Sequence, residues 1–390
     1  MSTFSLYIHV PFCAKKCPYC DFTTFAVRTV PEEEYCRSLQ RELQLYSEDP
    51  RFQGRRIRSI FWGGGTPSLL SGDTVSKIHN LAQKLFGYVS PDIEITLESN
   101  PIHLVPNSIS RLAEAGVNRL SIGAQSLQPR ILSLLGRDHC ADDIRNAVFY
   151  AVGKGIDNIN LDLIFSVPDQ TPEELGQDLQ EFTELPITHI STYNLTIERG
   201  TPFYQAVANG VFHKLSEDVE RSLYEIILQT LPSRGYAHYE VSNFAKPGHE
   251  CAHNLQYWSR QDYLGIGVGA HSFHRTSRLR WANSASLKEY HSRLQGSSFP
   301  EAWREELSSS EEFSETVMLG LRTRNGLDIR SIEDYFNLND FTKLNGLLTS
   351  LIEARLIRTE DDIVRLTDSG FACADSVISE IVSLQNQDSR

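Results

Sequence analysis

The sequence predicts an α/β fold built on parallel strands, and three observations support this prediction. Before residue 200, six short apolar segments alternate with helix-like segments, which is the pattern of repeated βαβ units. Chemically reactive residues follow several of these segments, where the sites of parallel α/β folds gather. The 390 residues are enough for one large domain and a smaller one. An α/β barrel and an open parallel sheet both fit these observations.

Each element of this series is marked by its own local pattern. Short apolar or alternating segments predict strands at Leu6–Val10, Ile57–Trp62, Ile93–Glu98, Asn118–Gly123, Asn158–Ile164 and His189–Thr196. Helix formers and apolar periodicity predict helices at Pro31–Tyr46, Gly72–Phe86, Asn107–Ala115 and Thr171–Thr183, and a helical region that ends near Val152. The run Thr-Pro-Glu-Glu at residue 171 favours a helix start, because threonine caps a helix and proline fits its first turn.

Beyond residue 200 the alternation becomes less regular. The polar residues Gly296–Ser310 are typical of a linker, and Arg355–Arg358 with Ile363–Thr367 predict a small β-wing. This end of the chain resembles a winged-helix module, for which the many acidic residues favour a packing or substrate-capping role. The further helices are expected at Leu215–Leu231, Ser314–Thr323, Ile329–Tyr335 and Phe341–Glu353.

The composition argues against two classes of partner. Lys and Arg total 37 against 50 Asp and Glu, a formal net charge of −13, whereas a nucleic-acid backbone calls for a basic face. No apolar run reaches the length of a membrane span, and the N-terminal segment lacks the basic region of a secretion signal. The 7 cysteines show no disulfide framework and fit a reducing compartment. We therefore expect a cytoplasmic protein with no nucleic-acid partner and no integral membrane segment.

Cys13, Cys17 and Cys20 form a C-x₃-C-x₂-C run behind the first expected strand. Their thiolates suit zinc and iron–sulfur clusters alike. A structural zinc ion needs a fourth ligand at short range, and neither His9 nor Cys36 lies at a familiar zinc spacing. Three thiolates are one fewer than a cubane cluster requires, which favours a [4Fe–4S] cluster with one open iron. An open iron can bind a small molecule.

Six motifs together resemble the oxygen-independent coproporphyrinogen III oxidase-like group of radical S-adenosylmethionine (SAM) proteins. They are Tyr7–Cys13, Phe61–Pro67, Glu98–Pro101, Ser121–Ser126, Asn160–Ile164 and Leu319–Arg322. The resemblance covers nearly the whole chain. It implies a partial (βα)₆ TIM-like radical SAM barrel at 1–245, a heme-contact and connecting segment at 246–300, and a smaller, mostly helical, winged-helix-like domain at 301–390.

The resemblance also implies roles for single residues. The three motif cysteines would hold the [4Fe–4S] cluster, whose open iron the methionyl amine and carboxylate of SAM would chelate. Gly64, Gly65 and Thr66 would let the backbone approach the methionyl end of SAM, where a Cβ would clash. Glu98 would accept the ammonium group or a ribose hydroxyl. The other residues implied to order the cluster or to contact SAM, or a second SAM, are Tyr7, Tyr19, Gln125, Arg137 and Asp162.

Two departures separate this chain from the oxidases of that group. The oxidases carry a further cysteine two residues after the third cluster ligand, whereas Cys20 is followed here by Asp21 and Phe22. They also have a long N-terminal extension that covers the substrate, and a short segment precedes Cys13 here. Both losses fall on the substrate chemistry, while the cluster and SAM residues are retained.

A further motif, His253-Asn-Leu-Gln-Tyr257-Trp258, matches the HNxxYW motif of a heme-chaperone branch of the same group. The match implies heme contact by His253, Tyr257 and Trp258, within what we expect to be a loop. Neutral imidazole ligates heme iron, and tyrosine and tryptophan offer flat apolar faces to a macrocycle. Nearby alternatives for the iron ligand are Cys251, His249, His271 and His274.

The resulting hypothesis is a heme chaperone that carries heme as cargo and delivers it to acceptor hemoproteins. Its cofactors would be a [4Fe–4S] cluster and SAM, and no residue is assigned a catalytic role. Two enzymatic alternatives stay open: radical decarboxylation of coproporphyrinogen III, and radical SAM chemistry on another substrate. A homodimer and a transient membrane contact also stay open.

Overall fold

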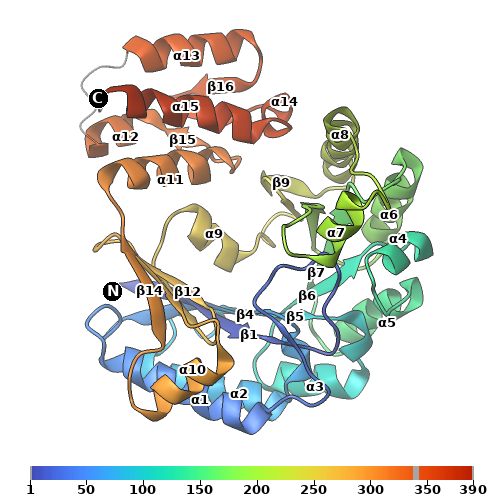
Figure 1. Ribbon diagram of the computed structural model, residues 1–390, viewed down its shortest axis with the longest axis vertical. Coiled ribbons are helices and arrows are strands. Elements are labelled where there is room, and N and C mark those ends of the chain that lie inside the picture. The colour runs from blue at the N-terminus through green and yellow to red at the C-terminus, as the bar shows by residue number, and fades with distance from the viewer. Residues whose placement is uncertain (1, 337–341, 389–390) are drawn as a thin grey trace.

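The computed structural model describes residues 2–336 and 342–388. Its centre is a sheet in which six parallel strands lie side by side in chain order (Figure 1). The two ends of this parallel set pair with further strands instead of with each other, so the barrel is open. The predicted α/β class and partial barrel are thus confirmed. The six strands are β1 (Thr3–Val10), β4 (Arg56–Gly64), β5 (Glu94–Ser99), β6 (Arg119–Gln125), β7 (Asn158–Phe165) and β8 (His189–Asn194).

Helices that connect these strands cover the outer face of the sheet (Figure 1). The helical region predicted to end near Val152 is two helices, separated by a loop with a left-handed turn at Gly136 (φ +67°). At the start of α6, Thr171 and Glu174 form the expected reciprocal cap. The helices of this part are α1 (Glu32–Glu48), α2 (Gly72–Phe86), α3 (Pro106–Glu114), α4 (Pro129–Leu134), α5 (Ala141–Val152), α6 (Pro172–Glu184), α7 (Pro202–Ala208) and α8 (Glu217–Ser233), with 3₁₀ turns at Pro67–Leu69 and Pro101–His103.

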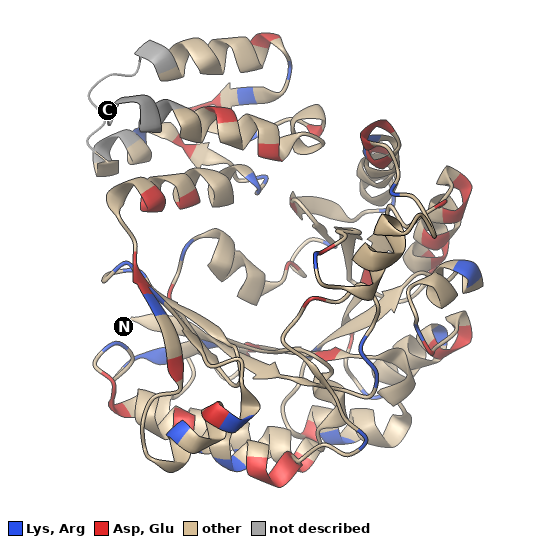
Figure 2. Cartoon of the chain, in the orientation of Figure 1, with Lys and Arg blue, Asp and Glu red and all other residues tan. Residues whose placement is uncertain are grey.

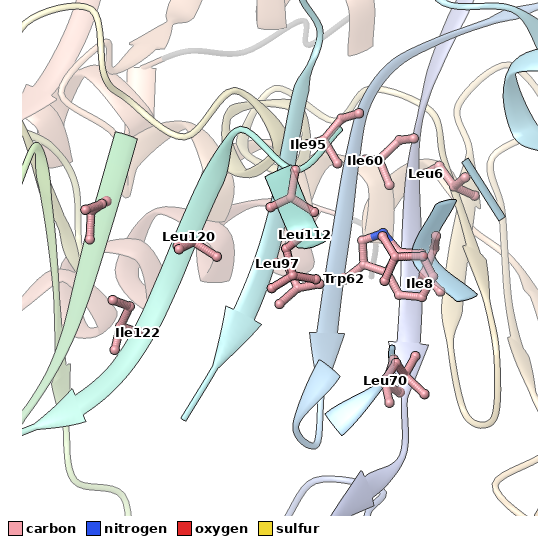
Figure 3. Close-up of a cluster of buried hydrophobic side chains, with 14 of the residues drawn as sticks. Leu6, Ile8, Ile60, Trp62, Leu70, Ile95, Leu97, Leu112, Leu120 and Ile122 are labelled. Atoms are coloured by element: carbon pink, nitrogen blue, oxygen red, sulfur yellow. The ribbon is translucent and has the colours of Figure 1, made fainter. Parts of the chain in front are cut away.

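The main hydrophobic core lies between the sheet and these helices. Alternate residues of a strand point to opposite faces, so one face of each parallel strand is buried against the helices, as Figure 3 shows for four of them. The residues in between, such as Tyr7 on β1 and Glu98 on β5, point to the inner face. The labelled core side chains are Leu6, Ile8, Ile60, Trp62, Leu70, Ile95, Leu97, Leu112, Leu120 and Ile122, each at most 6% exposed.

The later part of the chain extends the sheet at both ends. At one end, β8 pairs with β10 (Asn243–Ala245), which in turn pairs with β9 (Ala237–Glu240). β1 pairs in parallel with β11 (Tyr263–Ile266), which is followed by β12 (His271–His274), β13 (Leu279–Asn283) and β14 (Glu301–Glu306). The sheet therefore crosses the domain boundary predicted at residue 245. Helices α9 (Ala252–Trp258) and α10 (Leu287–Gln295) complete this part.

The prediction of a linker over Gly296–Ser310 is wrong for its middle, where β14 pairs with β13. β14 is an edge strand with most side chains exposed, so its polar side chains stay in water and pay no desolvation penalty. Arg280 on β13 and Glu305 on β14 add a cross-strand ion pair at 2.6 Å.

The C-terminal helices surround a small antiparallel sheet and a second core. The expected β-wing is present as β16 (Ile357–Glu360) and β17 (Ile363–Leu366), and β15 (Leu327–Asp328) joins it. Phe341, the first residue of one predicted helix, lies outside the described residues. Within the described ranges, no helix combines the length and apolar character needed to cross a bilayer. The helices are α11 (Ser309–Leu321), α12 (Ile329–Phe336), α13 (Thr342–Glu353), α14 (Asp368–Phe371) and α15 (Ala374–Asp388).

Glu42 on α1 fixes the turn between β11 and β12. Its carboxylate is fully buried and accepts hydrogen bonds from the Gly267 N–H (2.8 Å), the Tyr290 hydroxyl and the Asn283 amide. Gly267 itself has φ +100°, and a Cβ there would lie 2.5 Å from the His9 carbonyl. Burial raises the pKa of Glu42 to about 8, although these three hydrogen bonds each act to lower it. The turn that precedes His271 is therefore held by a carboxyl group that is mostly protonated at neutral pH.

Replacing Glu42 with glutamine is expected to change the pH dependence of stability. The folded chain holds the Glu42 proton more tightly than an unfolded chain, so this group lowers stability as pH rises through the window up to about 8. Glu42→Gln should cost about 1 kcal/mol near pH 6 and flatten this decline. Urea unfolding at pH 6 and pH 9 measures both, with the exposed Glu34→Gln on the same helix as control. If the free energy of unfolding falls equally in variant and wild type between pH 6 and pH 9, Glu42 does not have a raised pKa in the folded protein.

Candidate functional site

A cavity of about 530 Å³ opens at the carboxyl ends of the parallel strands. Its walls come from the segment after β1, the glycine-rich end of β4, and the ends of β5 to β8. The sequence-predicted residues that line it are Cys13, Cys17, Tyr19, Cys20, Gly64, Gly65, Thr66, Glu98, Gln125, Arg137 and Asp162. The structure thus brings together eleven residues that are spread over 150 positions of the chain.

The three cysteines lie on a loop closed at its base. β2 (Phe12–Cys13) pairs with β3 (Phe25–Ala26), and the Val27 N–H donates to the Cys13 carbonyl at 2.9 Å. The Cys20 N–H donates to the Cys17 carbonyl at 3.2 Å, which forms a turn between the last two thiols. Burial raises the pKa of the Cys13 and Cys20 thiols, and a bound metal would hold them as thiolates. Three thiols converge on one cavity, as a cluster requires.

The glycine-rich turn after β4 places backbone where side chains would not fit. The Gly65 N–H donates to the Val10 carbonyl and the Thr66 N–H to the Phe12 carbonyl, both at 2.8 Å. A Cβ on Gly65 would lie 2.6 Å from the Phe12 carbonyl oxygen and 3.1 Å from Cys13 Sγ. Gly64 has φ +107°. The turn is therefore fastened to the cysteine loop, and at Gly64 and Gly65 it presents only backbone to the cavity.

Two carboxylates, Glu98 and Asp162, face this cavity, and the Arg119 charge acts on Asp162. Burial, and then the charge of Asp162, raise the pKa of Glu98 to about 8. Burial raises the pKa of Asp162 to about 6, although Asn160 and Ser121 donate hydrogen bonds to it. No salt bridge joins either group to a basic side chain in the part of the chain that the structure describes. Such a pair fits a cationic ligand, because a positive charge would bring both pKa values down.

Arg137 links the cluster loop to the strand behind it. Its guanidinium donates to Cys17 Sγ at 3.4 Å and to the Gly123 carbonyl at 2.9 Å, and its Nε is buried without a hydrogen bond to any described residue. Gln125, at the end of β6, is held in the left-handed region with φ +68°. Asp178 on α6, which the sequence analysis missed, fixes the following residues by accepting from the Ser126 hydroxyl and the Leu127 N–H (2.9 Å).

A second cavity, of about 630 Å³, adjoins the first and lies between the sheet and the C-terminal helices. Tyr7, Gly64, Glu98 and Phe22 line it, and the last three also line the first cavity. The rest of its wall comes from His9, Asp21 and Thr23, from the turn before β12, from α9 with the loop that follows it, and from β11, β12, β13 and α11. The residues it includes from these elements are Tyr257, Arg260, Gln261, Tyr263, His271, Phe273, Arg280, Glu315, Met318 and Leu319.

The HNxxYW residues lie in helix α9, so the expectation of a loop is wrong. The Glu94 carboxylate caps the helix by accepting from the N–H groups of Ala252 (2.9 Å) and His253 (3.0 Å). His253 is 0% exposed: its Nδ1 is hydrogen-bonded to Ser59 Oγ and its Nε2 to the Tyr257 hydroxyl, both at 2.9 Å.

The rest of the motif lies on different sides of α9. Tyr257 reaches the second cavity, whereas Trp258 is half-buried and His253 is enclosed, and neither lines either cavity. Cys251 is also 0% exposed, with its Sγ 3.5 Å from Glu94. All residues predicted for the cluster and SAM except Tyr7 line the first cavity, and Tyr7 lines the second. Of the predicted heme residues, Tyr257 lines the second cavity, and the roles of all these residues stay predictions.

Comparison with known proteins gives two family matches. Residues 7–182 match the radical SAM superfamily, and residues 307–372 match the HemN C-terminal domain. The heme chaperone HemW of Lactococcus lactis is 34% identical over 97% of both chains. That of Bacillus subtilis is 33% identical over 94% of this chain and 96% of its own. That of Escherichia coli is 41% identical over 68% of this chain and 69% of its own.

A solved structure shows the same fold over most of the chain. The coproporphyrinogen III oxidase HemN of Escherichia coli, a radical SAM enzyme, superposes with a TM-score of 0.84 at 24% identity. The match covers 97% of this chain and 89% of that one. At this identity the likeness establishes the fold.

Proposed function

The chain belongs to the family of the heme chaperone HemW, and on that premise we propose that it binds heme and delivers it to acceptor hemoproteins. The observation that carries the proposal is the match to HemW proteins at 33–34% identity over more than nine-tenths of this chain. The position that holds a cysteine in the oxidases, two residues after Cys20, is occupied by Phe22, which is 58% exposed.

The proposal includes a [4Fe–4S] cluster on Cys13, Cys17 and Cys20, with SAM beside it. When bound, this pair supplies one-electron chemistry at the cavity. The chain's own contribution is positional: the turn at Gly64 and Gly65 presents backbone, and the charged groups of the cavity wall orient the ligand. Glu98 and Asp162 suit its cationic groups, and the positive charge of Arg137 at the cavity wall suits its carboxylate.

The protein partners in this proposal are acceptor hemoproteins and, for a homodimer, a second copy of this chain. A reducing, cytoplasmic location suits three thiolate ligands. Lys and Arg are interspersed with Asp and Glu around the ribbon, with acidic residues along α8 and α11 (Figure 2), which fits partners other than nucleic acid.

The proposal is tested on anaerobically reconstituted full-length protein. We expect heme to bind at one equivalent per chain, seen as a shifted Soret absorbance, and to pass to the apo-form of a b-type hemoprotein. With coproporphyrinogen III, SAM and reductant, we expect no vinyl product. Omission of the acceptor is the control for spontaneous heme loss. Steady formation of protoporphyrinogen without heme binding would contradict the proposal and favour the oxidase alternative.

A further inference from the structure

We propose that heme occupies the second cavity and that His271, not His253, supplies the ligand to its iron. The inference rests on the proposed function, because it assigns the place where the cargo is held. The second cavity lies between the sheet and α11, next to the proposed cluster and SAM cavity, and Phe22, Gly64 and Glu98 line both.

Both ring nitrogens of His253 are engaged in buried hydrogen bonds. The Ser59 hydroxyl donates to Ser5, so Nδ1 of His253 donates to Ser59 and Nε2 accepts from the Tyr257 hydroxyl. The lone pair that an iron would need is therefore already engaged in a fully buried hydrogen bond. Its geometry fits a positioning residue that holds Tyr257 at the wall of the second cavity.

His271 has the opposite environment. It is exposed at the start of β12, lines the second cavity, and its ring forms no hydrogen bond with another described residue. Its backbone is fixed, because His271 pairs with Ala282 on β13 and a Cβ on Gly265 would lie 2.1 Å from its carbonyl oxygen. Partial desolvation at the cavity wall and then the Arg280 charge lower its pKa below the usual 6.5, which favours the neutral imidazole at pH 7. A neutral, unbonded imidazole on a rigid strand is a ready iron ligand.

The walls of this cavity suit a flat macrocycle. Phe22 is 58% exposed at the rim, and Tyr257, Phe273 and Met318 add apolar surface. Outside the cavity lining, Trp303, 44% exposed, packs beside His271 with the ring centroids 6.2 Å apart. The volume of about 630 Å³ is within the range of cofactor-sized sites.

Two arginines of the cavity suit the heme propionates. Arg260 is 8% exposed and its terminal nitrogens pair with Glu312 (3.1 Å) and Glu315 (3.5 Å), while Arg280 pairs with Glu305 and Glu315. The Nε of each is buried without a hydrogen bond to any residue in the described ranges. Both Nε atoms are enclosed by protein, so a propionate would be met by the terminal nitrogens. Arg280 keeps one N–H on each of them, and Arg260, which also donates to Thr316 at 2.9 Å, keeps one.

The test is a ferric heme titration of the full-length protein and of single variants, followed by absorbance and electron paramagnetic resonance. His271→Ala should weaken heme binding at least about tenfold and remove the signature of a histidine-ligated iron. Added imidazole should restore that signature. The matched control is His274→Ala, on the same strand, whose ring is bonded to Ser277 at 2.7 Å and does not line the cavity. His253→Ala should keep the histidine-ligated spectrum.

The outcomes separate this inference from the function on which it rests. A His271→Ala spectrum and affinity equal to wild type would overturn the inference and leave the chaperone proposal standing. If His253→Ala loses the histidine signature and His271→Ala keeps it, the inference is likewise overturned and the chaperone proposal stands. Failure of the wild-type protein to bind heme at all would overturn both.

Discussion

Replacing Gly65 with alanine is expected to abolish assembly of the iron–sulfur cluster while the sheet stays folded. The added methyl would meet the carbonyl oxygens of Phe12 at 2.6 Å and Val10 at 2.8 Å, and Cys13 Sγ at 3.1 Å. Two of these contacts are backbone and cannot rotate away, so the turn and the cysteine loop must move apart. We expect iron content after anaerobic reconstitution to fall to about a tenth of wild type or lower.

Iron and sulfide analysis measures this result, and circular dichroism shows whether the fold survives. The matched control is Gly176→Ala on α6, where a Cβ would meet nothing within 4 Å and alanine is the better helix former. Normal cluster content in Gly65→Ala would show that the loop and the turn are not rigidly coupled.

Much of the fold and the first cavity was predictable because it depends on local sequence. The six parallel strands follow from short apolar segments, and parallel pairing brings their carboxyl ends to one edge. Residues as distant in the chain as Cys13 and Asp162 therefore reach one cavity without any further information. The cap at Thr171 likewise depends on a residue three positions away.

The rest depends on contacts between distant segments. Nothing near Cys251 in the sequence caps a helix, and α9 begins there because Glu94, on a distant strand, accepts its first N–H groups. The burial of His253 depends in the same way on Ser59 of β4. The polar residues 301–306 form a strand only because β13 offers an edge. A motif shows which residue types are present, and it does not show which of them faces a cavity.

The second large effect is expected from Glu98→Gln, which should weaken SAM binding about 10- to 100-fold at pH 8.5. The estimate follows from the loss of one charge-assisted hydrogen bond, worth about 1.5–3 kcal/mol. The wild-type affinity should also depend on pH. Glu98 has a pKa of about 8 in the free protein, and a cationic ligand binds its ionised form, so binding releases a proton and strengthens as pH rises from 6 to 9.

Glu98→Gln should lack the part of this pH dependence that the carboxyl group contributes, because its amide does not titrate, whereas the amino group of SAM titrates alike in both proteins. Below pH 7 the wild-type and variant affinities should converge, since Glu98 is then mostly protonated and Asp162, with a pKa of about 6, is the remaining anion. Calorimetry in two buffers of different ionisation enthalpy measures both the affinity and the proton release. The exposed carboxylate of Glu114 on α3 provides the control, as Glu114→Gln. A wild-type affinity that is flat from pH 6 to 9 would mean that Glu98 does not face the cation, and the positive charge of SAM would then have to be assigned to Asp162.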